Sequence, residues 1–233
     1  MEIKYAIIGM LVILLVLAGC QQKDGNTINV DGSSEITAKP DKAEVWAGIS
    51  ILENTAEEAQ NEANKVINAI IDGLRYKGIS EQDIQTESLN LYEERTWEDG
   101  ESKTVGWRAT QTLKVKTTDL TKVGTIVDIA VNNGANQINN INFGLSEAKE
   151  QEYKKQALAE ATKNAKAKAE TIAESLGVKL GKIKSVSESS FNYIPYMYAM
   201  EKAAGAPAVA EAATVMPQDV TVTATISLVY NIN

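Results

Sequence analysis

The stretch AEVWAGISILENTAEEAQNEANKVINAIIDGL, residues 43–74, changes its hydrophobic period partway along. Aliphatic residues first stand at every second position, which predicts a strand with one buried face. From residue 56 onward they recur at every third or fourth position, which predicts an amphipathic helix. Thr55 and Glu58 have the spacing of a capping box at the helix start, and Gly78 followed by Ile79 predicts the helix end. This segment therefore requires a fold that joins sheet and helix.

The rest of the chain continues the alternation of strands and helices. The expected elements are a strand over residues 28–38, which kinks at Gly32 and forms a hairpin with residues 45–51; a second hairpin of residues 89–91 with 105–115 around a turn at 98–101; a helix over 120–131 capped by Asp119; a strand at 138–143; a long alanine-striped helix over 147–176; and strands at 183–187 and 220–232. No succession of βαβ units dominates this order. We therefore expect an α+β fold of mainly antiparallel sheets packed against helices, in the order β-β-α-β-β-α-β-α-β-β.

The first residues of the chain read as an export signal. Residues 6–18 form an apolar run that is shorter than the 18 or so residues of a membrane span, and the run ends in small residues. Leu17-Ala18-Gly19-Cys20 resembles the bacterial lipobox at all four positions. That resemblance implies cleavage before Cys20 and attachment of diacylglycerol to its thiol. We expect a signal peptide at 1–19, a lipidated tether at 20–27, and a folded region at 28–233 with one domain or two subdomains.

Cys20 is the only cysteine, and two other roles compete with lipidation: a buried thiol and a catalytic nucleophile. The chain has 0 His, so no imidazole can serve as the base of a nucleophilic thiol. A lipid contributes about 0.8 kcal/mol per buried CH₂, so two or three acyl chains would give durable anchoring. We therefore expect the protein in the cell envelope, held on the periplasmic or extracytoplasmic side of a membrane through lipidated Cys20.

Charge and composition narrow the classes of ligand. The chain has 23 Lys and Arg against 31 Asp and Glu, a net charge of −8, which disfavours nucleic acid and electrostatic docking to anionic lipid. Asp31 with Glu35, and Glu98 with Asp99 and Glu101, form acidic clusters without the spacing of an EF-hand. The sequence also has no P-loop and no G-x-G-x-x-G pattern. We expect no metal site, no cofactor and no nucleic-acid partner.

Ser146-Glu147-Ala148-Lys149 matches the S-x-x-K pattern of serine acyl-enzymes and opens an expected helix. The S-D-N and K-T-G elements that accompany this pattern are missing. The simpler interpretation is that Ser146 caps the helix and that Lys149 is solvated. We therefore expect a protein that is not an enzyme, and the alternative is a hydrolase that uses Ser146 and Lys149.

The segment SFNYIPYMYAMEKAAGAPAVAEAATVMPQD, residues 190–219, has no clear period and is predicted as a long loop. Its first half concentrates aromatic residues and methionine, which suit a partner surface, an oligomer contact or a membrane interface. The alternative is that these side chains only cover a sheet edge. The candidate contact residues are Phe191, Tyr193, Tyr196, Met197 and Tyr198.

Several stretches, in order, resemble the SIMPL-domain family, also described as 26 kDa periplasmic immunogenic proteins. They are VDGSSEITAKPDKAEVWAGIS, TAEEAQNEANKVINAI, KGISEQDIQTESLNLY, GWRATQTLKVKTTDL, and ALAEATKNAKAKAETIAESLGVKLGKI. The resemblance implies an exported α+β protein without assigned catalytic residues, in a family whose members include ring-like or channel-like oligomers and have links to envelope or oxidative stress. The lipobox departs from the plain secretory signals of many members. We expect a non-catalytic envelope lipoprotein that acts as a homo-oligomer or through an envelope protein partner.

Overall fold

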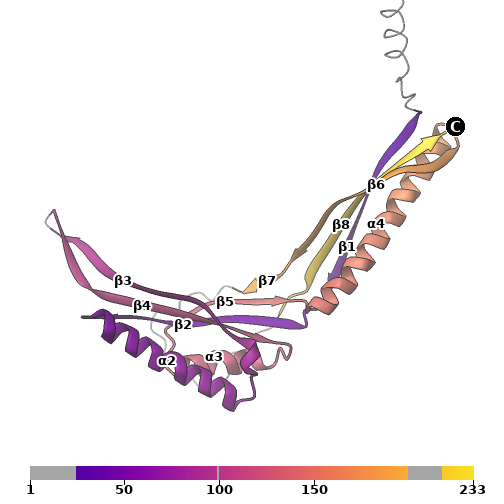
Figure 1. Ribbon diagram of the computed structural model, residues 1–233. Helices are drawn as coiled ribbons and strands as arrows, with labels where there is room; N and C mark the ends of the chain where they lie inside the picture. The colour runs from indigo at the N-terminus through magenta and orange to yellow at the C-terminus, as the bar shows by residue number, and fades with distance from the viewer. Residues whose placement is uncertain (1–24, 99, 199–216) are drawn as a thin grey trace, which may run out of the picture. The chain divides into compact units, whose positions relative to one another are not determined.

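The computed structural model describes residues 25–98, 100–198 and 217–233 (Figure 1). The elements are β1 (Thr27–Ala38), β2 (Lys42–Glu53), α2 (Ala56–Tyr76), the short 3₁₀ helix η1 (Glu81–Asp83), β3 (Ile84–Glu98), β4 (Glu101–Thr117), α3 (Lys122–Asn132), β5 (Gln137–Gly144), α4 (Glu147–Ser175), β6 (Leu180–Ile194), β7 (Tyr196–Tyr198) and β8 (Val220–Ile232). This α+β architecture confirms the predicted fold class. The observed order adds only η1 and the short β7 to the predicted one.

The described strands form two sheets. The large sheet has the order β3-β4-β2-β5-β7 and the small sheet has the order β1-β8-β6. The chain also divides into two compact units: unit 1 takes Ala161–Ser189, Thr225–Asn233 and the described part of Met1–Ser33, and unit 2 takes Ser34–Glu160 and the described parts of Ser190–Ala224. The boundary between the units crosses β1, α4, β6 and β8.

The predicted hairpin between residues 28–38 and 45–51 is wrong, because β1 and β2 belong to different sheets. The chain that leaves β1 is held at Asp41, whose N–H donates to the carbonyl of Gly144 at 2.9 Å. The Asp41 carboxylate accepts from the N–H and the hydroxyl of Ser146, at 2.6 and 2.8 Å. These contacts direct β2 alongside β5, so the turn at Pro40 does not fold the chain back on β1.

One face of the large sheet packs against α2 and α3, as Figure 1 shows. The stripe predicted on the first helix is the one that α2 buries, with Ala59, Ala63, Ile67, Ile70 and Leu74 all buried. The sheet contributes every second residue of β2, as predicted from the period of two. The core of unit 2 also includes these buried side chains: Val45, Ala47, Ile49, Leu113, Val115, Val123, Ile126, Ile141 and Phe143.

The ends of α2 confirm the predicted caps. The side chain of Thr55 accepts from the N–H of Glu58 at 3.2 Å, and its hydroxyl donates to the Glu58 carboxylate at 3.0 Å. At the other end, Ile79 N–H donates to the carbonyl of Leu74 at 3.0 Å, with Gly78 at a φ of 77°. A left-handed residue at this position suits glycine because it has no Cβ.

The start of α3 differs from the prediction that Asp119 caps it. The first residue of α3 is Lys122 and its N-cap is Thr121, which makes no side-chain cap hydrogen bond. Asp119 instead accepts from the N–H and the hydroxyl of Thr121, at 3.1 and 2.6 Å, in the turn that precedes the helix. These hydrogen bonds lower the pKa of the Asp119 carboxyl.

Unit 1 brings α4 close to β1. The alanine stripe predicted on the long helix is buried, with Ala161, Ala165 and Ala169 each at 0% exposure. A Cβ added to Gly32 would lie 2.1 Å from the carbonyl oxygen of Ala161 and 2.5 Å from the nitrogen of Ala165. The helix backbone therefore rests on a strand position that has no side chain. Leu176, the last residue of the predicted helix, lies past the end of α4 and is 64% exposed.

The β3–β4 hairpin extends beyond its neighbour β2. The last pair between β2 and β4 joins Glu53 to Trp107, whereas β3 and β4 stay paired as far as Glu98 and Glu101. We call residues 94–98 and 101–106 the ribbon arm. Trp97 is 74% exposed on this arm. A two-stranded ribbon of this kind has no third strand or helix under which an apolar side chain could be buried.

Candidate functional site

Cys20 and the predicted signal peptide at 1–19 lie outside the described residues, as does most of the predicted tether at 20–27. Among the described residues, no helix is both long enough and apolar enough to cross a membrane. The predicted lipid anchor therefore rests on the sequence of residues 1–20 and stays a prediction.

Ser146 stands at the start of α4, where its hydroxyl is occupied by structural contacts. The hydroxyl donates to the Asp41 carboxylate at 2.8 Å and accepts from the N–H of Lys149 at 3.5 Å. The second contact is the one that a helix cap makes with the third residue after it. The first contact fixes the helix start to the chain that follows β1. This geometry agrees with the interpretation of Ser146 as a cap.

The aromatic segment predicted as a loop at 190–219 begins in strands. Residues 190–194 continue β6 and residues 196–198 form β7, which pairs with β5; residues 199–216 lie outside the described part of the chain. The sequence does not predict the full length of β6, because serine and lysine occupy half of its positions before residue 190 and interrupt the apolar alternation. Tyr196, Met197 and Tyr198 form β7, but the structure does not describe their side chains.

Two of the candidate contact residues are tied into the fold of unit 2. The hydroxyl of Tyr193 accepts from the N–H of Leu145 at 2.6 Å, and burial raises the pKa of this hydroxyl. The ammonium of Lys154 lies 4.7 Å from the centre of the Phe191 ring, which is the geometry of a cation–π contact. Both aromatic side chains are half-buried. Phe191 thus contacts α4, and Tyr193 contacts the chain between β5 and α4, while the partner-surface and sheet-edge interpretations both stay predictions.

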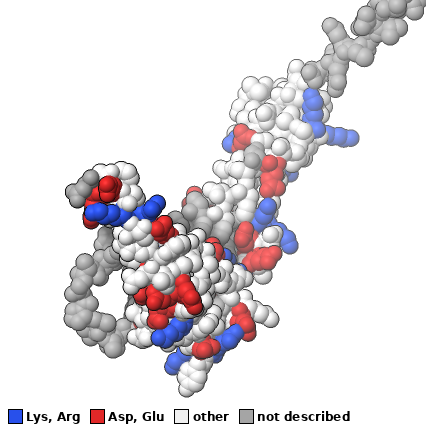
Figure 2. All heavy atoms as spheres, turned by 60° about the vertical axis from the view of Figure 1, so that its left-hand side comes forward, with Lys and Arg blue, Asp and Glu red and all other residues white. Residues whose placement is uncertain are grey.

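Charged side chains of both signs are intermixed on the face shown in Figure 2. Within the described ranges, no group of three or more acidic or cysteine side chains could hold a metal ion. In the predicted cluster of Asp31 and Glu35, the carboxylate of Asp31 accepts from the hydroxyl of Ser227. Glu98 pairs with Lys103 at 3.5 Å, and Asp99 lies outside the described residues.

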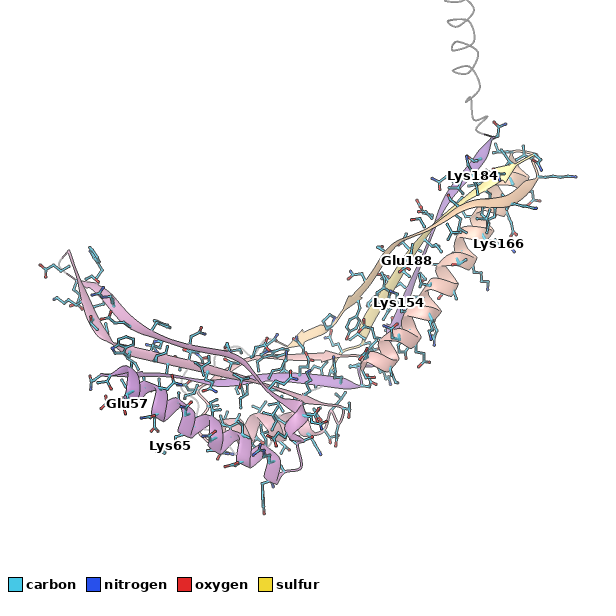
Figure 3. The ribbon with its side chains drawn as sticks, viewed as in Figure 1. Glu57, Lys65, Lys154, Lys166, Lys184 and Glu188 are labelled. Atoms are coloured by element: carbon cyan, nitrogen blue, oxygen red, sulfur yellow. The ribbon has the colours of Figure 1, made fainter. Side chains whose placement is uncertain are left out.

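The side of the large sheet opposite α2 and α3 carries a site that sequence reasoning missed. Figure 3 shows Glu57 and Lys65 projecting from α2 away from the strands. We call the opposite side of the strands the open face. Strand register places its side chains in cross-strand rows: Tyr92, Arg108 and Leu52; Asn90, Thr110 and Ser50; Ser88, Thr112, Gly48 and Gln137; and Lys114, Trp46 and Asn140.

A depression of about 390 Å³ opens on this face. Its volume lies in the range of small-molecule sites, which is about 300–1,000 Å³. The lining consists of polar groups with a single aliphatic side chain: Ser50, Arg108, Asn136, Gln137, Ile138 and Asn139.

Arg108 is the charged centre of this depression. Its Nε donates to the Glu94 carboxylate and its Nη1 donates to the hydroxyl of Ser50 at 3.1 Å. The hydrogen bond from Arg108 lowers the pKa of the Glu94 carboxyl and raises the pKa of the guanidinium. Both side chains are partly exposed, so the pair orients the guanidinium more than it stabilises the fold.

Asn136 fixes the adjoining wall of the depression. Its Nδ2 donates to the carbonyl of Ser50 at 2.8 Å and its Oδ1 accepts from the Ser50 N–H at 2.9 Å. The amide thus bonds to β2 in the way that another strand would, directly before β5 begins. The side chains of Gln137 and Asn139 make no hydrogen bond within the described chain, so the donor and acceptor groups of both amides are available to a ligand in the depression.

The row at the far end of the open face contains both a cation and an aromatic ring. The ammonium of Lys114 lies 5.9 Å from the centre of the Trp46 ring and 2.9 Å from the Glu87 carboxylate. The hydrogen bond from Lys114 lowers the pKa of the Glu87 carboxyl. Each cation of the two end rows therefore has its own carboxylate partner.

Comparison with known proteins agrees with the predicted resemblance. The family described as SIMPL, protein of unknown function (DUF541), matches residues 28–230. The chain is 30% identical over 189 residues to the uncharacterized protein YggE of Escherichia coli K12, covering 81% of this chain and 76% of that protein. It is 33% identical over 171 residues to the 26 kDa periplasmic immunogenic protein of Brucella melitensis biotype 1, covering 70% of this chain and 66% of that protein.

The chain therefore belongs to the SIMPL family. The name of the Brucella relative places that protein in the periplasm, and the name of the Escherichia coli relative assigns no activity. The family match begins at the first predicted strand and ends in β8, so the predicted signal peptide and tether at 1–27 precede it.

Proposed function

We propose that this chain is a non-catalytic protein of the cell envelope, held to a membrane by a lipid on Cys20 and acting by oligomerisation or by binding a protein partner. The lipobox at residues 17–20 supports the anchor. The periplasmic location named for the Brucella relative supports export. A role in envelope or oxidative stress is part of the proposal through the family resemblance alone.

The ribbon arm is the observation that carries the proposed mode of action. Trp97 is 74% exposed and Val105 is 46% exposed on this arm, where β2 no longer accompanies the hairpin. Leu89 adds a 52% exposed side chain further along β3, the edge strand of the large sheet. Tryptophan is enriched in the centres of protein interfaces, and exposed edge strands pair readily with another chain. An arm with these features suits a protein contact.

The alternative function, a serine acyl-enzyme, finds less support in the geometry. It needs the hydroxyl of Ser146 to be activated by Lys149. The hydroxyl instead bonds to the Asp41 carboxylate and to the backbone N–H of Lys149. A serine-directed acylating probe that labels Ser146 in the folded chain, and fails to label Lys149→Ala, would reinstate the enzyme.

Size-exclusion chromatography with light scattering tests self-association on the chain from Gln21 onward. We expect a mass above that of the monomer at micromolar concentration, reduced in the double variant Trp97→Ser with Val105→Thr. Tyr76→Ser is the matched control, because Tyr76 is 87% exposed on α2 outside the arm. Deletion of residues 190–218 tests the aromatic segment in the same assay.

Binding of a different protein partner needs a separate measurement. The natively lipidated protein is purified from membranes together with its bound proteins, which are identified by mass spectrometry. Two results together would contradict the proposed mode of action. The first is a strict monomer in size-exclusion chromatography. The second is that no copurified protein depends on the arm, meaning that none is lost with the arm variant while it is kept with Tyr76→Ser.

A further inference from the structure

We propose that the open face of the large sheet binds an uncharged oligosaccharide. The ligand would lie across the cross-strand rows, between the row of Tyr92 and Arg108 and the row of Trp46 and Lys114. The site adjoins the ribbon arm only at Glu94, the carboxylate partner of Arg108, and its lining side chains lie outside the arm, so the inference does not depend on self-association.

The chemistry of the lining fits hydroxyl groups. Hydroxyl and amide side chains both donate and accept hydrogen bonds, as sugar hydroxyls do. Ser50 and Thr110 lie in the middle rows, and Asn136, Gln137 and Asn139 line the adjoining depression. A ligand whose groups both donate and accept can satisfy such a surface without bringing a charge.

The charges of the face argue against a charged ligand. Arg108 is bonded to Glu94 and Lys114 is bonded to Glu87, so each cation is already neutralised by its own carboxylate. An anionic ligand would have to displace a carboxylate from its cation, and a cationic ligand would have to displace a cation from its carboxylate. Sulfated, phosphorylated or strongly basic polymers are therefore disfavoured.

A peptide fits this face less well than a sugar. Extended peptides are usually recognised by main-chain hydrogen bonds along a sheet edge. The two central strands under the open face, β4 and β2, are each paired on both sides, so a peptide could add main-chain hydrogen bonds only along an edge of the sheet, such as the edge strand β3. What this face offers is side chains, and the polar ones form rows rather than a ladder of backbone groups.

The two aromatic residues give the site its length. Tyr92 is 49% exposed beside Arg108, and Trp46 is half-buried beneath Lys114. Tyr92 lies in the same row as Leu52 of β2, and Trp46 is itself a residue of β2, so the two rows are six residues apart along that strand. At about 3.3 Å per residue the separation is about 20 Å, which exceeds a single sugar ring. Aromatic rings present an apolar face on which the C–H face of a sugar can stack.

The test measures binding of defined probes to the full-length chain in detergent. The probes are the tetramer of N-acetylglucosamine, maltotetraose, a tetragalacturonate as a charged control, and an unrelated tetrapeptide. Isothermal titration calorimetry gives the affinity, and saturation-transfer NMR shows which protons touch the protein. We expect at least one neutral tetramer to bind with a Kd of about 1 mM or tighter, and neither control to bind.

Two variants decide where the neutral tetramer binds. Asn139→Ala removes a lining amide that makes no hydrogen bond within the described chain, and Tyr92→Ala removes an exposed ring whose loss leaves the core intact. We expect each variant to weaken binding by about tenfold, and the control Asn68→Ala on the exposed side of α2 to leave it unchanged. Absence of binding by both neutral tetramers, equal binding by a control probe, or binding that survives Tyr92→Ala unchanged would overturn the proposal.

Discussion

Gly32 offers the sharpest test of how unit 1 is packed. In Gly32→Ala the new Cβ would lie 2.1 Å from the Ala161 carbonyl oxygen and 2.5 Å from the Ala165 nitrogen, and contacts below 3.0 Å are essentially never found. Both are backbone atoms of α4, so no side-chain rotation can relieve the clash. The helix must move away from β1 along the alanine stripe, and the close contacts of that stripe are lost with it.

The magnitude follows from two opposing effects. Inserting a methyl group into a packed interior costs about 1–3 kcal/mol, and a clash with backbone belongs at the upper end. Replacing glycine by alanine also stabilises the folded state by about 0.4–1 kcal/mol, because alanine restricts the conformations of the unfolded chain. We therefore expect Gly32→Ala to lower the free energy of unfolding by about 2 kcal/mol.

Urea unfolding of the chain from Gln21, followed by far-UV circular dichroism, measures this change. Ser33→Ala is the matched control, since its side chain is exposed and its carbonyl keeps the hydrogen bond from Asn164. The control should stay within about 0.5 kcal/mol. Adding Ala165→Gly should not rescue Gly32→Ala, because the backbone clash with Ala161 remains. A Gly32→Ala protein as stable as the control would refute the close approach of α4 to β1.

Three further predictions address the anchor, a helix cap and the Arg108 pair. Cys20→Ser should lose the lipid mass and leave the signal uncleaved at residue 19 in intact-protein mass spectrometry; cleavage at the usual position would contradict the lipobox. Thr55→Ala removes the side-chain cap of α2 and should lower the free energy of unfolding by about 1 kcal/mol in urea. The hydrogen bond from Arg108 holds the pKa of the Glu94 carboxyl below its ordinary value, so the contribution of the pair to stability is complete above that ordinary value and is lost as the pH falls through the lowered pKa. Arg108→Gln should return this pKa toward its ordinary value in a carboxyl ¹³C titration, and a pKa that stays lowered in the variant would contradict the pair.

The elements of the fold follow largely from local sequence patterns. The period of two in residues 45–51 and the three-to-four period after residue 56 identify β2 and α2, because each pattern marks one buried face. The caps at Thr55 and Gly78 follow from side-chain and backbone chemistry within a few residues. The partner of β1 does not follow in this way. Alternation specifies which face of a strand is buried and says nothing about which strand lies beside it.

The candidate site could not be predicted from the sequence for a related reason. Arg108, Ser50 and Asn136 are far apart in the sequence and meet only through the register of β4 with β2 and the turn before β5. One sequence signal was present, since residues 132–142 are rich in asparagine and few of them are apolar. Tyr193 is a second example, because its hydroxyl accepts from the N–H of Leu145 and no local sequence pattern indicates that contact.

In the proposed function, an anchored and exported domain acts through contacts with a second copy or with another protein. Site-specific photocrosslinking from position 97, in the natively expressed and membrane-bound chain, detects such contacts. The proposal predicts a discrete crosslinked species, either with a second copy or with one envelope protein, that is absent when the photoreactive residue replaces Tyr76. A chain that stays uncrosslinked at position 97 while remaining folded and membrane-bound would contradict it.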